Sequence, residues 1–240
     1  MQKYIQVYNL GRMEYTKCLN IQKYLLKQQL NSLDSNKTSL DSIILVEHDP
    51  VYTIGLRRNK YEQSYLDKLR QLNAQVELTD RGGLITFHGP GQLVAYPILN
   101  LKNFNPSLKW YVTKLEQTII DLCKSSFNLK AYRMCNIGYT GVWLNEAKIS
   151  AVGVHCKRYI TYHGVSLNCN VDLKWFGHIV PCGIEDKKVS SLTNELGREL
   201  SVSEAMPMFL DSFKNVFNAQ TVISDREQVD SLISKSGASF

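Results

Sequence analysis

The stretch Arg81-Gly82-Gly83-Leu84-Ile85-Thr86-Phe87-His88-Gly89-Pro90-Gly91-Gln92 contains four glycines and one proline in twelve residues. Apolar segments typical of strands flank it at residues 75–78 and 93–99. Because glycine has no Cβ, we expect a loop whose backbone can approach a ligand closely. It is not a Walker loop, since no Gly-Lys-Ser/Thr follows, and not a dinucleotide-binding fingerprint, since no helix opens after it. Composition alone leaves open a glycine-rich hairpin without a catalytic role.

The chain before this stretch alternates between helical and extended patterns. Residues that recur near a period of 3.6 predict a first helix with one buried face, namely Tyr15, Cys18, Leu19, Gln22, Leu25, Leu26 and Leu30. The polar residues 32–42 predict a loop, and strands are expected at residues 43–46, 51–54 and 75–78. A charged segment at residues 65–73 predicts a short helix.

The chain after this stretch contains a second long helix, then strands, then a third helix. Ser107 is the expected N-cap of a helix whose face is Leu108, Tyr111, Val112, Leu115, Ile119, Leu122 and Cys123. Residues 141–144, 149–154 and 159–167 predict an antiparallel meander. The capping box of Ser201 and Glu204 opens a helix expected to bury Met206, Phe209, Leu210, Phe213 and Phe217. We expect an α+β fold, with one mixed sheet sandwiched by helices over residues 1–233, and a disordered tail at residues 234–240.

Composition excludes several classes of protein. The 240 residues are 44% hydrophobic, and their longest apolar runs, such as residues 43–46, are far too short to span a bilayer. The net charge of +6 comes without a Lys/Arg run of the kind that binds nucleic acid, and it fits acidic protein partners. The N-terminus shows neither a secretory apolar region nor an Arg/Ser-rich presequence. The six cysteines include no Cys-x-x-Cys pair and no zinc spacing, so we expect reduced thiols and no metal site.

Cys182 lies between a proline and a glycine in Ile179-Val180-Pro181-Cys182-Gly183-Ile184. A lone cysteine beside apolar residues is commonly a buried small hydrophobe, but this position outside any periodic pattern indicates a shaped loop. A nucleophilic thiol needs a neighbour that favours the thiolate. The residues alone leave four candidates for that neighbour open: Lys148, His88, His163 and His178.

Lys148 opens a predicted strand that is unusually rich in small residues. A single lysine at the edge of a strand is usually solvated. Ser150, Ala151 and Gly153, however, leave room on one strand face for something to lie against it.

These segments together resemble the signature of the lipoyl(octanoyl) transferases. The resemblance spans about residues 7–217, and its blocks occur in the family's order. Besides the glycine-rich stretch, they are Tyr96-Pro97, Tyr139-Thr140-Gly141-Val142-Trp143, Lys148-Ile149-x-Ala151-x-Gly153-Val154, His163-Gly164-Val165-Ser166-Leu167-Asn168, Pro181-Cys182-Gly183 and Ser190-Ser191-Leu192. Ile160-Thr161-x-His163 and the run from Trp175 to Gly183 are most similar to the eukaryotic, mitochondrial branch.

The resemblance implies the fold of biotin protein ligases and lipoate ligases, and it places a Cys/Lys catalytic dyad on Cys182 and Lys148. It also implies an acyl pocket lined by Arg81, Gly82, Gly83, Leu84, Ile85, Thr86, Phe87, His88, Ala151, Val152, Gly153, Gly164, Val165 and Ser166. Ser166 stands where the family pattern leads us to expect alanine, which affects the expected chain-length preference rather than the reaction.

The activity implied is transfer of an octanoyl group from octanoyl-acyl carrier protein, through a cysteine thioester, to a lysine of lipoyl domains. The implied acceptors are the lipoyl domains of 2-oxoacid dehydrogenase E2 subunits and the glycine cleavage H protein. No cofactor is implied, because a thioester donor needs no ATP. The implied location is the mitochondrial matrix, or the cytoplasm of a bacterium. Two alternatives stay open: an ATP-dependent lipoate or biotin ligase on the same fold, and a non-catalytic module that binds lipoyl domains.

Overall fold

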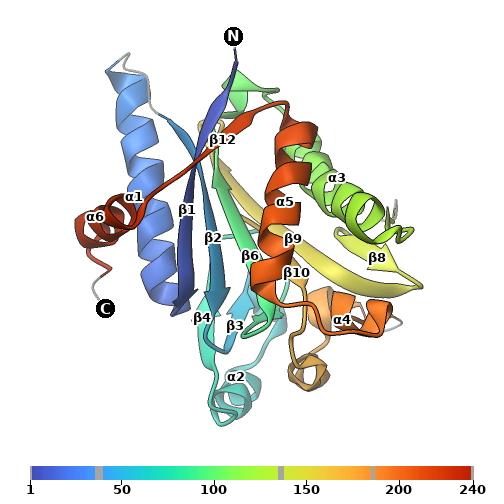
Figure 1. Ribbon diagram of the computed structural model, residues 1–240. Coiled ribbons are helices and arrows are strands. Elements are labelled where there is room, and N and C mark those ends of the chain that lie inside the picture. The colour runs from blue at the N-terminus through green and yellow to red at the C-terminus, as the bar shows by residue number, and fades with distance from the viewer. Residues whose placement is uncertain (1, 36–39, 135–137, 185–186, 239–240) are drawn as a thin grey trace.

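The protein is described by a computed structural model over residues 2–35, 40–134, 138–184 and 187–238. Within these residues, nine strands form the main sheet in the order β12-β1-β2-β6-β10-β9-β8-β7, with β11 beside β9. They are β1 (Tyr4–Met13), β2 (Asp41–His48), β6 (Gln92–Ile98), β7 (Tyr132–Arg133), β8 (Val142–Leu144), β9 (Ala147–Lys157), β10 (Ile160–Asn168), β11 (Lys188–Val189) and β12 (Gln220–Ile223). The helices are α1 (Tyr15–Asp34), α2 (Gln63–Arg70), α3 (Leu108–Phe127), α4 (Leu192–Leu196), α5 (Val202–Phe217) and α6 (Arg226–Ser236) (Figure 1).

The main sheet is mixed. Strand β1 runs parallel to β2 and β12, whereas β2, β6, β10, β9 and β8 are antiparallel neighbours. The run β8-β9-β10 is the predicted meander. A second sheet contains β3 (Val51–Ile54) between β4 (Gln75–Leu78) and β5 (Thr86–His88). Both the α+β class and the mixed sheet predicted from the sequence are confirmed.

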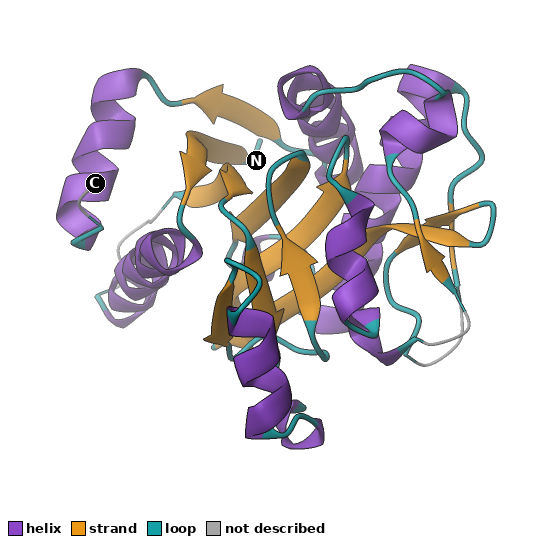
Figure 2. Ribbon diagram, turned by 90° about the horizontal axis from the view of Figure 1, so that it is seen from below, coloured by secondary structure: helices purple, strands orange, loops and turns teal. Residues whose placement is uncertain are grey.

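Helices cover both faces of the main sheet, because its central strands are apolar on both sides. Along β2, Ile43 and Leu45 pack into one core with α3 and α5, while Ile44 and Val46 pack into the other with α1 and α6. This is the period of two that a strand imposes. Figures 1 and 2 show the two pairs of helices on opposite sides of the strands. No helix in the described part of the chain is long and apolar enough to span a membrane.

The structure differs from the sequence predictions at several boundaries. Strands β1 and β12 and helix α6 were not predicted, and α1 continues through Asp34 into the expected loop at residues 32–42. The prediction of a disordered tail from residue 234 is wrong, because α6 continues to Ser236 and Ala238 is buried after the helix cap. Residues 239–240 of the expected tail lie outside the described residues. Leu108 is exposed at the start of α3, and Met206 is only half-buried on α5.

Candidate active site

The glycine-rich stretch joins the two sheets. Its first residues lie against β9, where the amide of Gly82 donates to the carbonyl of Val154 at 3.0 Å. Any side chain at Gly153 would meet this loop, since a Cβ there would lie 3.0 Å from Cδ of Arg81. The small residues of β9 therefore make room for the chain's own loop as well as for a cavity. At the other end, Gly91 has φ 83° and packs directly on the backbone of Asn170.

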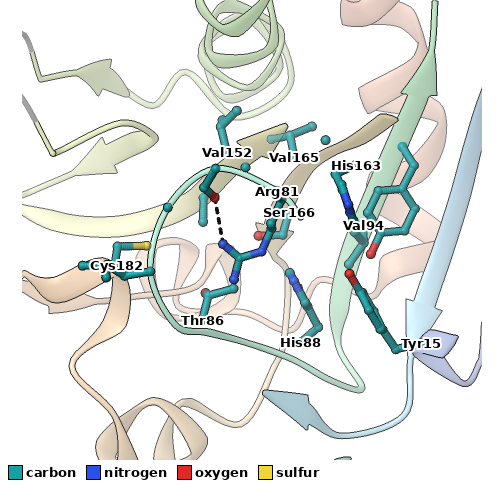
Figure 3. Close-up of a pocket in the computed structure, with 17 residues that line it drawn as sticks. Tyr15, Arg81, Thr86, His88, Val94, Val152, His163, Val165, Ser166 and Cys182 are labelled. Atoms are coloured by element: carbon teal, nitrogen blue, oxygen red, sulfur yellow. Dashed lines mark hydrogen bonds between the residues drawn. The ribbon is translucent and has the colours of Figure 1, made fainter. Parts of the chain in front are cut away.

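A cavity of about 460 Å³, including its open mouth, lies between this loop and strands β6, β9 and β10 (Figure 3). It brings together Cys182 and all but two of the residues expected to line an acyl pocket. Those lining residues are Arg81, Gly82, Gly83, Leu84, Thr86, His88, Ala151, Val152, Gly153, Gly164, Val165 and Ser166. The two exceptions are Ile85 and Phe87, which are fully buried in the core of the smaller sheet instead. Residues on β5 alternate between two faces, so Thr86 and His88 reach the cavity while Phe87 points away from it.

Four further residues that were not predicted as pocket residues line the same cavity. They are Tyr15, Val94, Tyr96 and His163. Tyr15 and Val94 carried only the apolar patterns of a helix and a strand in the sequence. Their place in the cavity follows from tertiary packing that no local pattern reports.

Cys182 lies in a short 3-10 turn, η4 (Pro181–Gly183), at one end of this cavity. Its backbone has φ 57° and ψ 13°, a left-handed conformation that is costly for a residue with a Cβ. Its amide donates to the carbonyl of Ile85 at 2.9 Å, which fixes the turn to the glycine-rich loop. Strained, well-anchored backbone of this kind is typical of functional positions.

Lys148 is buried, with 5% of its surface exposed, which rules out the solvated strand-edge lysine that the sequence had left open. It shares a second, smaller cavity with Cys182, Thr86 and Ser166. Its Nζ has no hydrogen-bond partner among the described residues and lies 5.3 Å from the ring centroid of Trp143. A buried ammonium without a partner costs stability, so its position points to a function.

Glu116, on α3, is a buried acid beside this lysine that the sequence analysis missed. Its Oε1 accepts the amide of Gly141 at 2.8 Å. Gly141 in turn lies close against Lys148, since a Cβ added at this glycine would be 2.5 Å from the lysine Cε. Burial raises the pKa of Glu116, while the charges of Arg133 and Lys148 act in the opposite direction. The carboxylate thus fixes the position of Gly141, against which Lys148 packs.

Arg81 contributes a second buried cation. Its guanidinium donates to the carbonyl of Thr53 at 2.6 Å and to that of Gly82 at 3.0 Å. No carboxylate of the described chain forms an ion pair with it. Burial lowers the pKa of Arg81, and Tyr15 and Cys182 are among the groups that counter this effect. The arginine is therefore within electrostatic range of Cys182.

The histidines are placed differently from Lys148. His88 lies in the larger cavity, bonded to Oε1 of Gln92 at 2.6 Å, and burial lowers its pKa to about 3. Figure 3 shows His163 at the end of that cavity opposite Cys182, where its Nε2 bonds to Asp80 at 2.8 Å. His178 is exposed. Among the four candidates for the thiol's neighbour, Lys148 is the one that lines the smaller cavity with Cys182.

Comparison with known proteins identifies the family. Residues 14–214 match the family described as the lipoyl protein ligase A/B catalytic domain. The chain belongs to this family. It is 48% identical over 214 residues to the mitochondrial octanoyl-[acyl-carrier-protein]:protein N-octanoyltransferase of Danio rerio, covering 89% of this chain and 92% of that protein. It is 40% identical to an octanoyltransferase of Koribacter versatilis, covering 91% and 86% of the two chains.

Solved structures show the same lipoyl protein ligase A/B fold at low sequence identity. A lipoate-protein ligase A bound with ATP superimposes with a TM-score of 0.72 at 13% identity, covering 98% of this chain and 94% of that chain. The biotin protein ligase of Aquifex aeolicus, in complex with biotin and ATP, gives 0.53 at 14% identity, covering 91% and 71%. The fold expected from the resemblance is thus confirmed.

Proposed function

We propose that this chain is an octanoyltransferase that moves an octanoyl group from acyl carrier protein to a protein lysine through a thioester on Cys182. The observation that carries the proposal is the unpartnered, buried ammonium of Lys148 in the same cavity as the Cys182 thiol. The names of two relatives, at 48% and 40% identity over most of the chain, support the reaction and the octanoyl group.

The first step is attack of the Cys182 thiolate on the carbonyl carbon of the donor thioester. A new C–S bond forms, the carrier's C–S bond breaks, and the carrier leaves as a thiol after taking up the proton of the Lys148 ammonium, which leaves Lys148 neutral for the second step. Lys148 and Arg81 are the cations that favour the attacking thiolate. The amides of Gly82 and Ile85 are not available to the oxyanion that forms, because they already donate to the carbonyl of Val154 and to the hydroxyl of Tyr61.

The oxyanion of the tetrahedral intermediate needs amide donors that are not otherwise engaged. Gly83 and Leu84 follow Gly82 in the loop and line the larger cavity with Cys182. Their amides have no hydrogen-bond acceptor among the described residues. We assign the oxyanion hole to these two amides.

The second step transfers the acyl group to the acceptor lysine. Its neutral amine attacks the Cys182 thioester, an amide bond forms, and the cysteine thiolate is released. Lys148, in its neutral form, accepts the proton that the amine loses. Both steps exchange one acyl bond for another, so no nucleotide is consumed.

An ATP-dependent ligase is the second candidate, because lipoate-protein ligase A has this fold and was solved with ATP. Such an enzyme would activate a free acid and would not need a thiol. The position of the Cys182 thiol in one cavity with Lys148 favours the transferase. A non-catalytic binding module would have no use for a buried lysine that is left without a partner.

The partners follow from the reaction. The donor is octanoyl-acyl carrier protein, and the acceptors are lipoyl domains of 2-oxoacid dehydrogenase E2 subunits and the glycine cleavage H protein. The described residues from β1 to α6 act as one catalytic domain, and the names of relatives support a mitochondrial location. Within the mitochondrion we place the protein in the matrix.

The experiment combines the purified protein with octanoyl-acyl carrier protein and an apo lipoyl domain, without ATP. We expect the domain to gain one octanoyl group, and Cys182→Ala to give none while remaining folded. Transfer that occurs only with ATP and free octanoate would establish the ligase instead.

A further inference from the structure

The larger cavity has two distinct ends. Figure 3 shows Cys182 at one end and Tyr15, Val94 and His163 at the other. Ser166 also lines the smaller cavity that holds Lys148, so it lies in the half nearer the thiol. An acyl chain attached to the thiol would extend along the cavity, so its terminal methyl group would be the part of the chain that meets the opposite wall.

Tyr15 closes that end. It is the first residue of α1, and only 1% of its surface is exposed. Its ring stacks on His88 with centroids 6.3 Å apart and meets the edge of His48 at 5.3 Å. The tyrosine is therefore fixed by packing between two buried rings, and it cannot rotate aside without opening the core.

Hydrogen bonds fix the residues around Tyr15. His48 bonds to the hydroxyl of Tyr96 at 2.9 Å and to the carbonyl of Met13 at 2.8 Å. His163 is held by Asp80 at 2.8 Å. Tyr15 itself has no side-chain hydrogen bond to the described residues, so replacing it breaks no such bond in this wall.

We propose that Tyr15 is the residue that limits acyl chain length, by forming the rigid end of the pocket. The proposal rests on the proposed function, since it needs an acyl chain attached at Cys182. It assigns length selection to the far end of the cavity and leaves Ser166, the departure from the family pattern, with a role near the thiol.

The preference for an acyl group should rise with the number of its methylenes that the pocket can bury. Each buried methylene raises kcat/KM by about fourfold until the chain meets Tyr15. A longer chain must then leave part of itself outside or displace a packed ring. Removing the ring in Tyr15→Ala should extend the series by about two methylenes and raise the decanoyl-to-octanoyl preference by about sixteenfold.

The test is a competition among carrier proteins that bear hexanoyl, octanoyl, decanoyl and dodecanoyl groups. Intact mass shows which acyl group is found on Cys182. We expect octanoyl on the wild type and on Tyr15→Phe, which keeps the ring, and longer chains on Tyr15→Ala. A folded Tyr15→Ala protein with the wild-type preference would overturn the assignment.

A second variant covers the case in which Tyr15→Ala does not fold. Val94→Leu adds volume at the same end, so the preference should move from octanoyl towards hexanoyl by about fourfold. An unchanged preference in this variant also counts against the proposal. The absence of any acyl adduct on wild-type Cys182 is a different result, which would remove the proposed function rather than the role of Tyr15 within it.

Discussion

Replacing Lys148 by methionine should make the protein more stable and at the same time inactive. The ammonium is buried and has no hydrogen-bond partner among the described residues, and such a group costs about 1–3 kcal/mol. The Trp143 ring at 5.3 Å recovers about 0.5–1 kcal/mol of this. Methionine has a similar shape and carries no charge. The difference is a net gain of up to about 2.5 kcal/mol, reduced at neutral pH because Glu116 loses a neighbouring cation.

The measurement is thermal and urea unfolding of Lys148→Met, with Lys157→Met as the matched control. Lys157 is an exposed lysine on the same strand, so its replacement should change stability by less than about 0.5 kcal/mol. For a chain of this size, Tm should rise by about 2–4 °C for each kcal/mol gained. The same variant should react with iodoacetamide at Cys182 more slowly, because the cation that shares the smaller cavity with the thiol is gone. A Lys148→Met protein that is less stable than the control, with unchanged alkylation, would refute the account of this lysine.

Three further predictions follow from the charges of the molecule. Glu116→Gln keeps an acceptor for the Gly141 amide but removes a carboxylate that interacts with the charge of Lys148, so the pH–rate profile of acyl transfer should change; an unmoved profile would limit Glu116 to packing. Burial lowers the pKa of His48 to about 4 and of His88 to about 3, from 6.5, so below about pH 6.5 the unfolded chain takes up protons that the folded state does not. The free energy of unfolding should therefore be highest above about pH 6.5 and fall towards pH 4, by up to about 1.4 kcal/mol per pH unit for each histidine. Urea midpoints should fall with it, and equal midpoints at about pH 7.5 and pH 5.5 would contradict this. With a net charge of +6, kcat/KM should fall with added salt more steeply for octanoyl-carrier protein than for octanoyl-CoA, whereas equal slopes would exclude charge steering of the carrier.

Local patterns predicted the elements that carry their own signals. The capping box of Ser201 and Glu204 is present with both hydrogen bonds, and the helices at Tyr15 and Ser107 begin where expected. Strand β1 was not predicted because Gly11, with φ 63°, lies where the pairing register with β2 shifts and interrupts the alternation. Pairing with β2 and β12 on its two sides stabilises this strand, although its sequence lacks a clear strand pattern.

The candidate site was predicted in part, and mainly through the family resemblance. The residues alone could not choose the neighbour of Cys182, because Lys148 is distant in sequence and only the folded chain places both at the smaller cavity. Tyr15 carried only the apolar pattern of a helix, and Glu116 carried no signal of a role. Only the three-dimensional arrangement places one at the end of the cavity and the other behind the lysine.

The thioester on Cys182 can be tested by the intact mass of the protein after brief mixing with octanoyl-acyl carrier protein in the absence of any acceptor. We expect the mass to increase by one octanoyl group, located on Cys182 by peptide mapping and lost on addition of an apo lipoyl domain. The same mixing with Cys182→Ala should leave the mass unchanged. An octanoyl group transferred to the lipoyl domain at the wild-type rate by Cys182→Ala would contradict the thioester mechanism.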